Sequence, residues 1–378
     1  MEKRVVFELT RSFFGLPLSC EVMEALQKGV DWAKALELAR AHGVGSICEE
    51  ALRSLSHDLP GLPEAKASFR RERHFNAYRA QRALRDLREV LDALCAGGIN
   101  PIVLKGASLA LGLYGDPVLR PMGDLDLLVK EGDAPRAMMA LLQEGYMPGG
   151  EVMTRWVAEN LTSHLPVLEA PERVPVEIHF RLFPRGTPLF PEEQRVWGRA
   201  IQGESQGVRF LRLAPPDELL YLCGHTVRHD SDAHKLIWFC DIALLDRTLT
   251  DEDRKAFQAS LAHTTRTDAI LGALGTARAW FAQGDGQGSY DPEGVMDSPM
   301  TLEDRRISEV LPRLGMFLAR MPSWGIRVRF LLAYCFPSLA YIRWFHGPRT
   351  EREAWFWRVK RPFWAVSRAL RSALVKGR

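Results

Sequence analysis

Residues 122–129, Met-Gly-Asp-Leu-Asp-Leu-Leu-Val, contain the pattern that decides the fold of this chain. In a strand, side chains two positions apart face the same way, so we expect Asp124 and Asp126 to project two carboxylates from one face. The leucines and the valine around them would anchor the other face. Two carboxylates this close stay ionised together only beside a positive charge, and Mg²⁺ is a cation that prefers oxygen ligands. The alternative is a strand end with two solvated aspartates, which is common.

Candidate phosphate contacts precede this segment. Lys105 and Gly106 directly follow a short apolar segment, 102–104, that we predict to be a buried strand. A lysine holds phosphate as a point charge, and a glycine lets the backbone approach a phosphate closely. Arg120, just before the two aspartates, is a second candidate phosphate contact. These neighbours favour a metal and phosphate site over two solvated aspartates.

A third carboxylate comes from a later segment. In residues 176–180, Val-Glu-Ile-His-Phe, polar and apolar side chains alternate, so Glu177 and His179 should share one face of a strand. A carboxylate on a neighbouring strand is what phosphoryl transfer with two metal ions needs, because it helps to hold the ion that activates the attacking oxygen. His179 is therefore a candidate site residue too, and His164 is a weaker one.

The periodicity of apolar residues predicts helices, then a small α/β unit, then helices again, which is an α+β fold. We expect an N-terminal helical region at 1–95, an α/β core at 96–214, a helical region at 215–282 that completes the cleft, and a basic, aromatic helical region at 301–378. Glycine, aspartate and proline at 284–299 indicate a loop or linker.

The same patterns predict individual elements. Gly97 and Gly98 should end a long helix that begins near Ala65, and Asp133 and Asp217 should cap the helices that follow them. The predicted strands are 102–104, 125–129, 165–168, 174–180 and 208–213, and the third and fourth of these could form a hairpin.

Composition limits the class of protein. The net charge is only +3, which counts against binding to long nucleic acid. The 6 cysteines include no CxxC pair, so we expect reduced thiols in a cytoplasmic protein instead of a disulfide framework or a zinc finger. We expect no signal peptide, because the N-terminus has no continuous apolar segment. The longest apolar stretch, 330–342, contains Pro337 and is too short to cross a bilayer.

The motifs around the aspartates resemble those of a known family. The run from Leu104-Lys-Gly-Ala-Ser-Leu through Tyr114 to Leu119-Arg-Pro-Met-Gly-Asp-Leu-Asp-Leu-Leu-Val129 is similar to an LKG…Y…RPxxDxDLLV signature. That signature is typical of an uncharacterised bacterial nucleotidyltransferase family within the DNA polymerase-β-like superfamily. Later segments resemble the family in order: Ser163-His-Leu-Pro166, Val176-Glu-Ile-His-Phe-Arg-Leu182, Tyr221-Leu-Cys-Gly-His225, His229 and Trp238-Phe-Cys-Asp241.

The resemblance implies a minimal nucleotidyltransferase core, which is a small mixed sheet with helices behind it. It also implies Mg²⁺, or Mn²⁺, held by Asp124, Asp126 and Glu177. It implies transfer of a nucleoside monophosphate from an NTP, with ATP favoured, to the hydroxyl of an unidentified acceptor, with release of pyrophosphate. The nucleotide would contact residues around the carboxylates: Lys105, Gly106, Ser108, Arg120, His179 and His225. One departure concerns triphosphate binding, because the superfamily's usual first motif is Gly-Ser or Gly-Gly, and here it is Lys-Gly.

Two other functions stay open from the sequence. The chain could be a binding module that keeps the fold without turnover, or a scaffold that contacts a membrane through its C-terminal tail. From Arg343 onward the tail has four tryptophans among many basic residues: Trp344, Trp355, Trp357 and Trp364. This composition is typical of a helix on an anionic membrane surface or on nucleic acid. Tryptophans packed on the core, with solvated arginines, would give the same composition.

Several histidines and one aspartate need partners. His225, His229 and His234 lie near Asp230 and Asp232 and could hold zinc, but HxxxH without an intervening glutamate is weak evidence for a metal site. The resemblance implies instead that one or two of these histidines line the nucleotide or acceptor cleft. Asp241 lies in an apolar helical segment, and a buried aspartate needs a partner, for which Arg228 or a histidine is a candidate.

Overall fold

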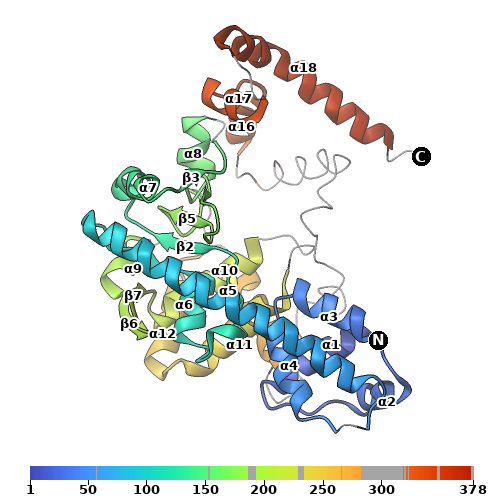
Figure 1. The fold of residues 1–378 in the computed structure, drawn as a ribbon. Helices are drawn as coiled ribbons and strands as arrows, with labels where there is room; N and C mark the ends of the chain where they lie inside the picture. The colour runs from blue at the N-terminus through green and yellow to red at the C-terminus, as the bar shows by residue number, and fades with distance from the viewer. Residues whose placement is uncertain are drawn as a thin grey trace.

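This structure, a computed structural model, describes residues 1–56, 58–151, 154–185, 193–228, 234–264, 266–281, 318, 321, 323–346 and 350–375. These residues form an α+β fold in which one seven-stranded mixed sheet is preceded and followed by helices (Figure 1). The predicted fold class is therefore confirmed. The predicted loop at 284–299 lies outside the described residues.

The sheet has the strand order β3-β4-β5-β2-β1-β7-β6. At its centre, β2 runs parallel to β5 and antiparallel to β1, and β1 runs parallel to β7. Both β1 and β2 are buried along their whole length, which explains why their sequences are mostly apolar. The strands are β1 Ile102–Val103, β2 Leu125–Leu128, β3 Met147–Pro148, β4 Leu168–Glu169, β5 Val176–His179, β6 Ile201–Ser205 and β7 Val208–Arg212.

Every predicted strand has a counterpart in this sheet, and the predicted hairpin is the antiparallel pair of β4 and β5. Two further strands, β3 and β6, were not predicted. β3 has only 2 residues, and β6 reads Ile-Gln-Gly-Glu-Ser without an apolar face. β6 is a strand because it pairs with β7 across a turn in which Gln206 and Gly207 both have positive φ.

The N-terminal helices are α1 Glu2–Ser12, α2 Cys20–Lys28, α3 Trp32–Ala41, α4 Gly45–Arg53 and α5 Leu62–Ala96. The long helix α5 ends as predicted. After Gly97, Gly98 takes φ +70°, and the amide of Ile99 donates to the carbonyl of Leu94 at 2.9 Å, which satisfies one of the last carbonyls of the helix. The first half of α5 packs on the N-terminal helices and its second half packs on the sheet.

Eight further helices surround and follow the sheet strands. They are α6 Lys105–Gly112, α7 Ala134–Gln143, α8 Arg155–Leu161, α9 Glu193–Arg199, α10 Pro215–Arg228, α11 Leu236–Thr248, α12 Asp251–Leu261 and α13 Thr267–Phe281, as counted over the described residues. In Figure 1 the sheet and the helices α10 to α12 lie toward the left-hand end of α5, and the helices α1 to α4 lie toward its right-hand end.

Of the two aspartates predicted to cap helices, Asp133 takes the N-cap position of α7 without a capping hydrogen bond, and Asp217 is not at a cap. The side chain of Asp133 accepts no hydrogen bond from the backbone of α7, and Nη1 of Arg136 donates to its carboxylate at 3.0 Å. Asp217 lies inside α10, which begins at Pro215, and its carboxylate pairs with Nη2 of Arg199 at 2.7 Å. In both cases a nearby arginine binds the carboxylate in a charge-assisted hydrogen bond.

The N-terminal helices and the helices after the sheet share one hydrophobic core, although they are far apart in the sequence. Phe14 stacks on Phe281 with ring centroids 4.4 Å apart, and Nε of Arg11 donates to the carbonyl of Trp280 at 2.9 Å. A second core lies between α5, α7 and the sheet. Because of the shared core, α3 and α5 reach the edge of the cavity described below.

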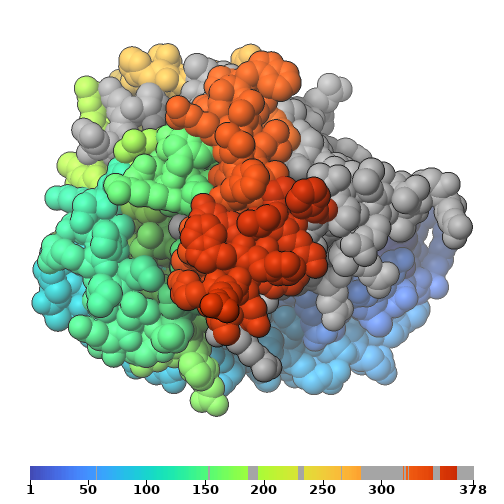
Figure 2. Space-filling model, turned by 90° about the horizontal axis from the view of Figure 1, so that it is seen from above, coloured from blue at the N-terminus to red at the C-terminus, as the bar shows by residue number. Residues whose placement is uncertain are grey.

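The C-terminal helices are α16 Trp324–Cys335, α17 Leu339–His346 and α18 Glu351–Val375. Buried Arg361 of α18 ties them together, since its Nε donates to the carbonyl of Tyr334 at 2.9 Å and its guanidinium lies 4.9 Å from the ring centroid of Tyr341. Figure 2 shows these orange and red helices as a layer on one face of the molecule, beside the green segment around α8. In the part of the chain that the structure describes, no helix has the length and apolar character needed to span a bilayer.

Candidate active site

Strands β2 and β5 bring the acidic residues together. In their parallel pairing, Asp126 is the register partner of Glu177, and Leu128 is the partner of His179. Neighbouring strands lie about 4.8 Å apart, so the two carboxylates stand side by side. Leu125 and Leu127 alternate with Asp126 and are fully buried, which fixes the face on which the carboxylates lie.

Asp126, Glu177 and His179 form the central cluster of the site. Oδ1 of Asp126 accepts a hydrogen bond from Nζ of Lys105 at 2.6 Å and lies 2.8 Å from Nε2 of His179. The same Nε2 lies 3.4 Å from Oε2 of Glu177. One ligand atom from each of the three residues lies within 4.8 Å of the others, and no other cluster of this kind occurs among the described residues.

The charges of this cluster stabilise one another. Burial opposes ionisation of Asp126, but Lys105 and the hydrogen bond from His179 outweigh it and hold the pKa of Asp126 well below its usual range. The hydrogen bond from His179 also lowers the pKa of Glu177. Burial disfavours the charged form of His179, but the hydrogen bonds of its ring to Asp126 and Glu177 outweigh burial and raise the pKa of His179. Lys105 and His179 thus favour the ionised forms of Asp126 and Glu177.

The backbone at Lys105 aims its side chain at Asp126. Lys105 is the first residue of α6 and has φ +46°, a left-handed conformation that costs a residue other than glycine about 1 kcal/mol or more. Just before it, the amide of Leu104 donates to the carbonyl of Asp126 at 2.9 Å and fixes the two segments against each other. Strained backbone of this kind concentrates at functional sites. Gly106 follows and lines the same cavity as Lys105.

Asp124 lies in a more open position than Asp126. It precedes β2, is exposed, and lines the same cavity as Asp126, as expected from their spacing. Its carboxylate is not part of the three-residue cluster. Desolvation in the cavity and the charge of Asp126 raise the pKa of Asp124 to about 6. The two aspartates therefore have different environments, one paired with cations and one open to a ligand.

The donor atoms of the cluster fit a divalent cation. Two carboxylates and one imidazole are ligands that Mg²⁺ or Mn²⁺ accepts, and the nitrogen donor suits Mn²⁺ better than Mg²⁺. Ligand atoms on opposite sides of such an ion are about 4.2 Å apart, which the mutual distance limit of 4.8 Å in this cluster permits. Nζ of Lys105 contacts Oδ1 of Asp126, so a cation would share that oxygen with the lysine or would use Oδ2.

A cavity of about 780 Å³ opens over the cluster, which is enough for a ligand the size of a nucleotide. Its walls come from the sheet, from α10 and α11, and from α3 and α5. Three cations of this lining have no ion-pair partner among the described residues: Arg79, Arg228 and Lys235. Together with Lys105, they make the cavity suited to a polyanion.

Arg120, a predicted phosphate contact, forms a buried ion pair instead. Its Nε donates to Oδ1 of Asp241 at 2.9 Å, and its Nη2 donates to Oδ2 at 2.8 Å. Nη1 donates to the carbonyl of Pro121, and the hydroxyl of Tyr114 donates to Asp241 at 2.7 Å. The prediction that Arg228 or a histidine pairs with Asp241 is wrong. Arg120 lines the cavity, but its donors tie the sheet region to α11.

Ser108 and His225, also expected at the nucleotide, lie in different environments. Ser108 is fully buried in α6 and donates to Glu218 at 2.8 Å, away from the cavity lining, because this face of α6 turns toward the core. Its predicted contact with the nucleotide is therefore not supported. His225 lines the cavity from α10, and its ring centroid lies 4.9 Å from that of Trp238.

Of the other candidate histidines, His164 lies at the cavity and His234 lies in the interior. His164 lines the cavity and pairs with His179 through an isolated antiparallel bridge. His234 is buried, with Nε2 lying 2.8 Å from the carbonyl of Thr226. Neither His225 nor His234 belongs to a zinc-like cluster within the described residues. His229, Asp230 and Asp232 lie outside those residues.

Sequence reasoning missed several residues that line the cavity. Arg40 and Arg79 come from α3 and α5, and Lys235 precedes α11. No local pattern distinguishes a helical arginine at a cavity from one in solvent, so only the packing of the N-terminal helices reveals them. In the sequence, Arg228 was considered only as a partner of Asp241. Its position one helical turn after His225, a predicted nucleotide contact, could have indicated that it lines the cavity too.

The segment that forms this site matches one known protein family. A family model described as an uncharacterised nucleotidyltransferase matches residues 28–282. The matched segment includes every residue of the cluster and of the cavity lining. No curated protein matches the chain.

Proposed function

Because the chain belongs to this uncharacterised nucleotidyltransferase family, we propose that it transfers a nucleoside monophosphate from an NTP to the hydroxyl of an acceptor, using a divalent metal ion. The observation that carries the proposal is the cluster of Asp126, Glu177 and His179 at the base of a cationic cavity. ATP is the first nucleotide to test, and Mg²⁺ and Mn²⁺ are the ions.

The lining residues divide into two groups in this proposal. Asp126 and Glu177 would hold the ion, and Asp124 would join them from the mouth of the cavity. A bound ion of this kind neutralises phosphate charge and helps to deprotonate the attacking hydroxyl. Lys105, together with Arg228 and Lys235, would bind the triphosphate.

The reaction exchanges one bond at the α-phosphorus for another. The acceptor oxygen bonds to this phosphorus while the bond to the pyrophosphate oxygen breaks, and the hydroxyl proton leaves toward the carboxylates near Glu177. Lys105 stays beside the phosphates and offsets the negative charge that develops on the leaving pyrophosphate. Catalysis would come mainly from positioning and charge stabilisation, as is usual for phosphoryl transfer.

The test is to incubate the protein with each NTP labelled at the α-phosphate, with Mg²⁺ or Mn²⁺, and with cell extract. We expect one nucleotide to label one class of acceptor and to release pyrophosphate only when the metal is present. The rival is a binding module without turnover. If the protein binds NTP but neither consumes it nor labels any molecule, that rival is correct.

A second proposed function is contact between the C-terminal helices and an anionic membrane surface. On α16, Trp324 and Leu332 are 76% and 55% exposed, and on α18, Val359 and Phe363 are 65% and 74% exposed. On each helix, side chains spaced by four or eight residues lie on one face, so each pair forms an apolar stripe. Apolar side chains that are exposed side by side on a helix are a feature of interaction sites.

Cations accompany these exposed aromatic rings. The guanidinium of Arg358 lies 5.2 Å from the ring centroid of Trp355, and Nζ of Lys360 lies 5.4 Å from that of Phe356. Trp355 is 52% exposed, which argues against the alternative that its ring packs on the core. Aromatic rings with adjacent basic groups fit the headgroup region of an anionic bilayer. The enzyme would then act in the cytoplasm at a membrane surface.

A further inference from the structure

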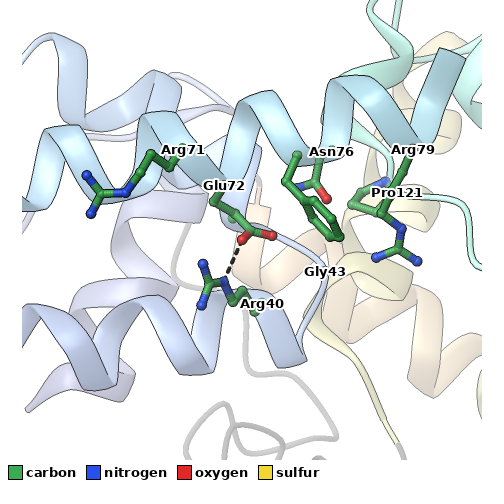
Figure 3. Close-up of a pocket in the computed structure, with 9 residues that line it drawn as sticks. Arg40, Gly43, Arg71, Glu72, Asn76, Arg79 and Pro121 are labelled. Atoms are coloured by element: carbon green, nitrogen blue, oxygen red, sulfur yellow. Dashed lines mark hydrogen bonds and ion pairs between the residues drawn. The ribbon is translucent and has the colours of Figure 1, made fainter.

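A second pocket, of about 520 Å³, lies between the N-terminal helices and the sheet region (Figure 3). Arg40 at the end of α3 and Arg71 and Arg79 on α5 supply its positively charged lining, and we call it the arginine pocket. In Figure 3 these side chains come from two helices that face each other, and Pro121 lies at the end of the pocket near Arg79.

The arginine pocket adjoins the cavity above the carboxylate cluster. Four residues line both spaces: Arg40, Gly43, Arg79 and Pro121. Gly43 has φ +73°, and a Cβ there would lie 3.2 Å from a methyl carbon of Ile237, so this shared wall requires glycine. One molecule could therefore occupy the arginine pocket and extend a reactive group toward Asp126.

The arginine pocket has more positive than negative charge. Among the described residues, Glu72 is the one acidic residue of its lining, and it pairs with Nε of Arg40 at 2.5 Å. Arg71 donates to the hydroxyl of Ser68 at 2.9 Å, and Arg79 contacts the ring of Phe75. Neither Arg71 nor Arg79 has a carboxylate partner in the part of the chain that the structure describes. Two guanidinium groups are thus available for a ligand's oxyanion.

The same pocket offers an aromatic surface. Phe75 lines it and is 55% exposed, and the guanidinium of Arg79 lies 5.7 Å from its ring centroid. Beside it, Asn76 is buried and donates to the hydroxyl of Ser46 at 3.1 Å, which holds α5 against α4. An exposed ring between two arginines favours a ligand that combines an anionic group with a planar or apolar part.

We propose that the arginine pocket binds the acceptor, and that the acceptor carries a phosphate or carboxylate group. This inference rests on the proposed nucleotidyl transfer. The triphosphate needs Lys105 and the cluster around Asp126, whereas the only carboxylate of the arginine pocket is already paired with Arg40. An oxyanion held there therefore belongs to the second substrate, whose hydroxyl then reaches the α-phosphorus in the shared cavity.

The experiment uses phenyl phosphate and phenylacetate as probes. Their binding to the full-length protein is measured by ligand-observed NMR, with a saturating α,β-methylene ATP and Mg²⁺ present so that the nucleotide position is filled. Arg71→Gln, which lines only the arginine pocket, should weaken probe binding about tenfold, as expected for one lost charge-assisted hydrogen bond. Arg70→Gln is the matched control, because Arg70 is an exposed arginine on the same helix outside the pocket.

Each outcome decides the inference. Stronger binding of phenyl phosphate assigns the oxyanion as phosphate, and stronger binding of phenylacetate assigns it as carboxylate. If Arg71→Gln changes neither, or if both probes bind only without the nucleotide analogue, the inference is overturned. A short single-stranded RNA is tested as a third probe. If it binds more tightly than the two small probes, and if both variants weaken its binding equally, the inference is overturned in favour of a nucleic-acid surface. Affinity for the analogue itself, measured in parallel, reports on the proposed function separately.

Discussion

Asp126 and Glu177 are register partners on the parallel strands β2 and β5, and Nε2 of His179 lies close to the carboxylates of both. The site therefore depends on strand register. A slip of one residue would turn Glu177 to the opposite face of the sheet and separate the two carboxylates. The buried side chains of Val176 and Ile178 on β5 oppose that slip, because it would move them out of the core.

Replacing Lys105 should weaken nucleotide binding. In Lys105→Ala, we expect the Kd for NTP to rise about tenfold or more, because one charge-assisted contact to phosphate is lost. The measurement is a titration with a fluorescent nucleotide in the presence of Mg²⁺. Lys255→Ala, at an exposed lysine on α12 outside the cavity, is the control. An unchanged affinity in Lys105→Ala would contradict its proposed contact with phosphate.

The buried pair of Arg120 and Asp241 should matter for stability. Asp241→Asn is expected to lower the free energy of unfolding by about 3 kcal/mol, because the guanidinium of Arg120 stays buried without its counter-charge. Urea unfolding measures this change. Replacing both residues, as in Arg120→Met with Asp241→Leu, should cost less than the sum of the single changes. If Arg120→Met instead kept full stability and lost nucleotide affinity, Arg120 would be a phosphate contact after all.

Asp246 should make stability depend on acid pH. Nη2 and Nε of Arg278 donate to it at 2.6 and 2.8 Å, and although burial opposes its ionisation, these bonds lower the pKa of Asp246. Its folded pKa lies below the ordinary value of 3.8, so its contribution is present above about pH 4 and is lost as the pH falls through the folded pKa. The stabilising bonds should therefore be fully present at neutral pH.

The corresponding variant is Asp246→Asn. It should lower the free energy of unfolding by about 2 kcal/mol at pH 7 and by less at pH 3, as measured by urea unfolding at both values. Asp92→Asn, at an exposed aspartate of α5, should show no such difference. A loss of equal size at both pH values would show that the charge of Asp246 is not the cause.

Apolar residues of α18 should carry membrane binding. The double variant Val359→Glu and Phe363→Glu should no longer sediment with vesicles rich in phosphatidylserine, because it places charges on the exposed stripe. Its affinity for NTP should stay unchanged. Met139→Glu, at a side chain of α7 that is 57% exposed, is the control for adding a charge to another exposed apolar position. Sedimentation equal to that of the unmodified protein would rule out the stripe as a membrane contact.

Local patterns predicted much of the sheet and part of the site. The alternation around Asp126 and Glu177 is a property of each strand, so it could be seen without knowing which strands pair. The structure adds the pairing, which depends on contacts between distant segments. β6 could not be predicted in the same way, because its pairing with β7 creates a strand from residues without an apolar face.

Side-chain partners were harder to predict than strands. Arg120 lies close to the aspartates in the sequence. An arginine at that position can contact a phosphate or form an ion pair, and the sequence does not distinguish the two. Only the packing of α11 against the sheet region shows that Asp241 occupies its donors. Arg40 and Arg79 reach the cavity because the N-terminal helices share a core with α10 to α13, which no segment of the sequence shows alone.

The most direct test of the central claim compares the protein with Asp126→Asn and Glu177→Gln for transfer of an α-phosphate label from NTP, with the metal present. Both variants keep the shape of the side chain and remove its charge. We expect label transfer to fall at least about a thousandfold in each, while thermal unfolding shows that both remain folded. Label transfer that stays near the unmodified rate in either folded variant would contradict the account.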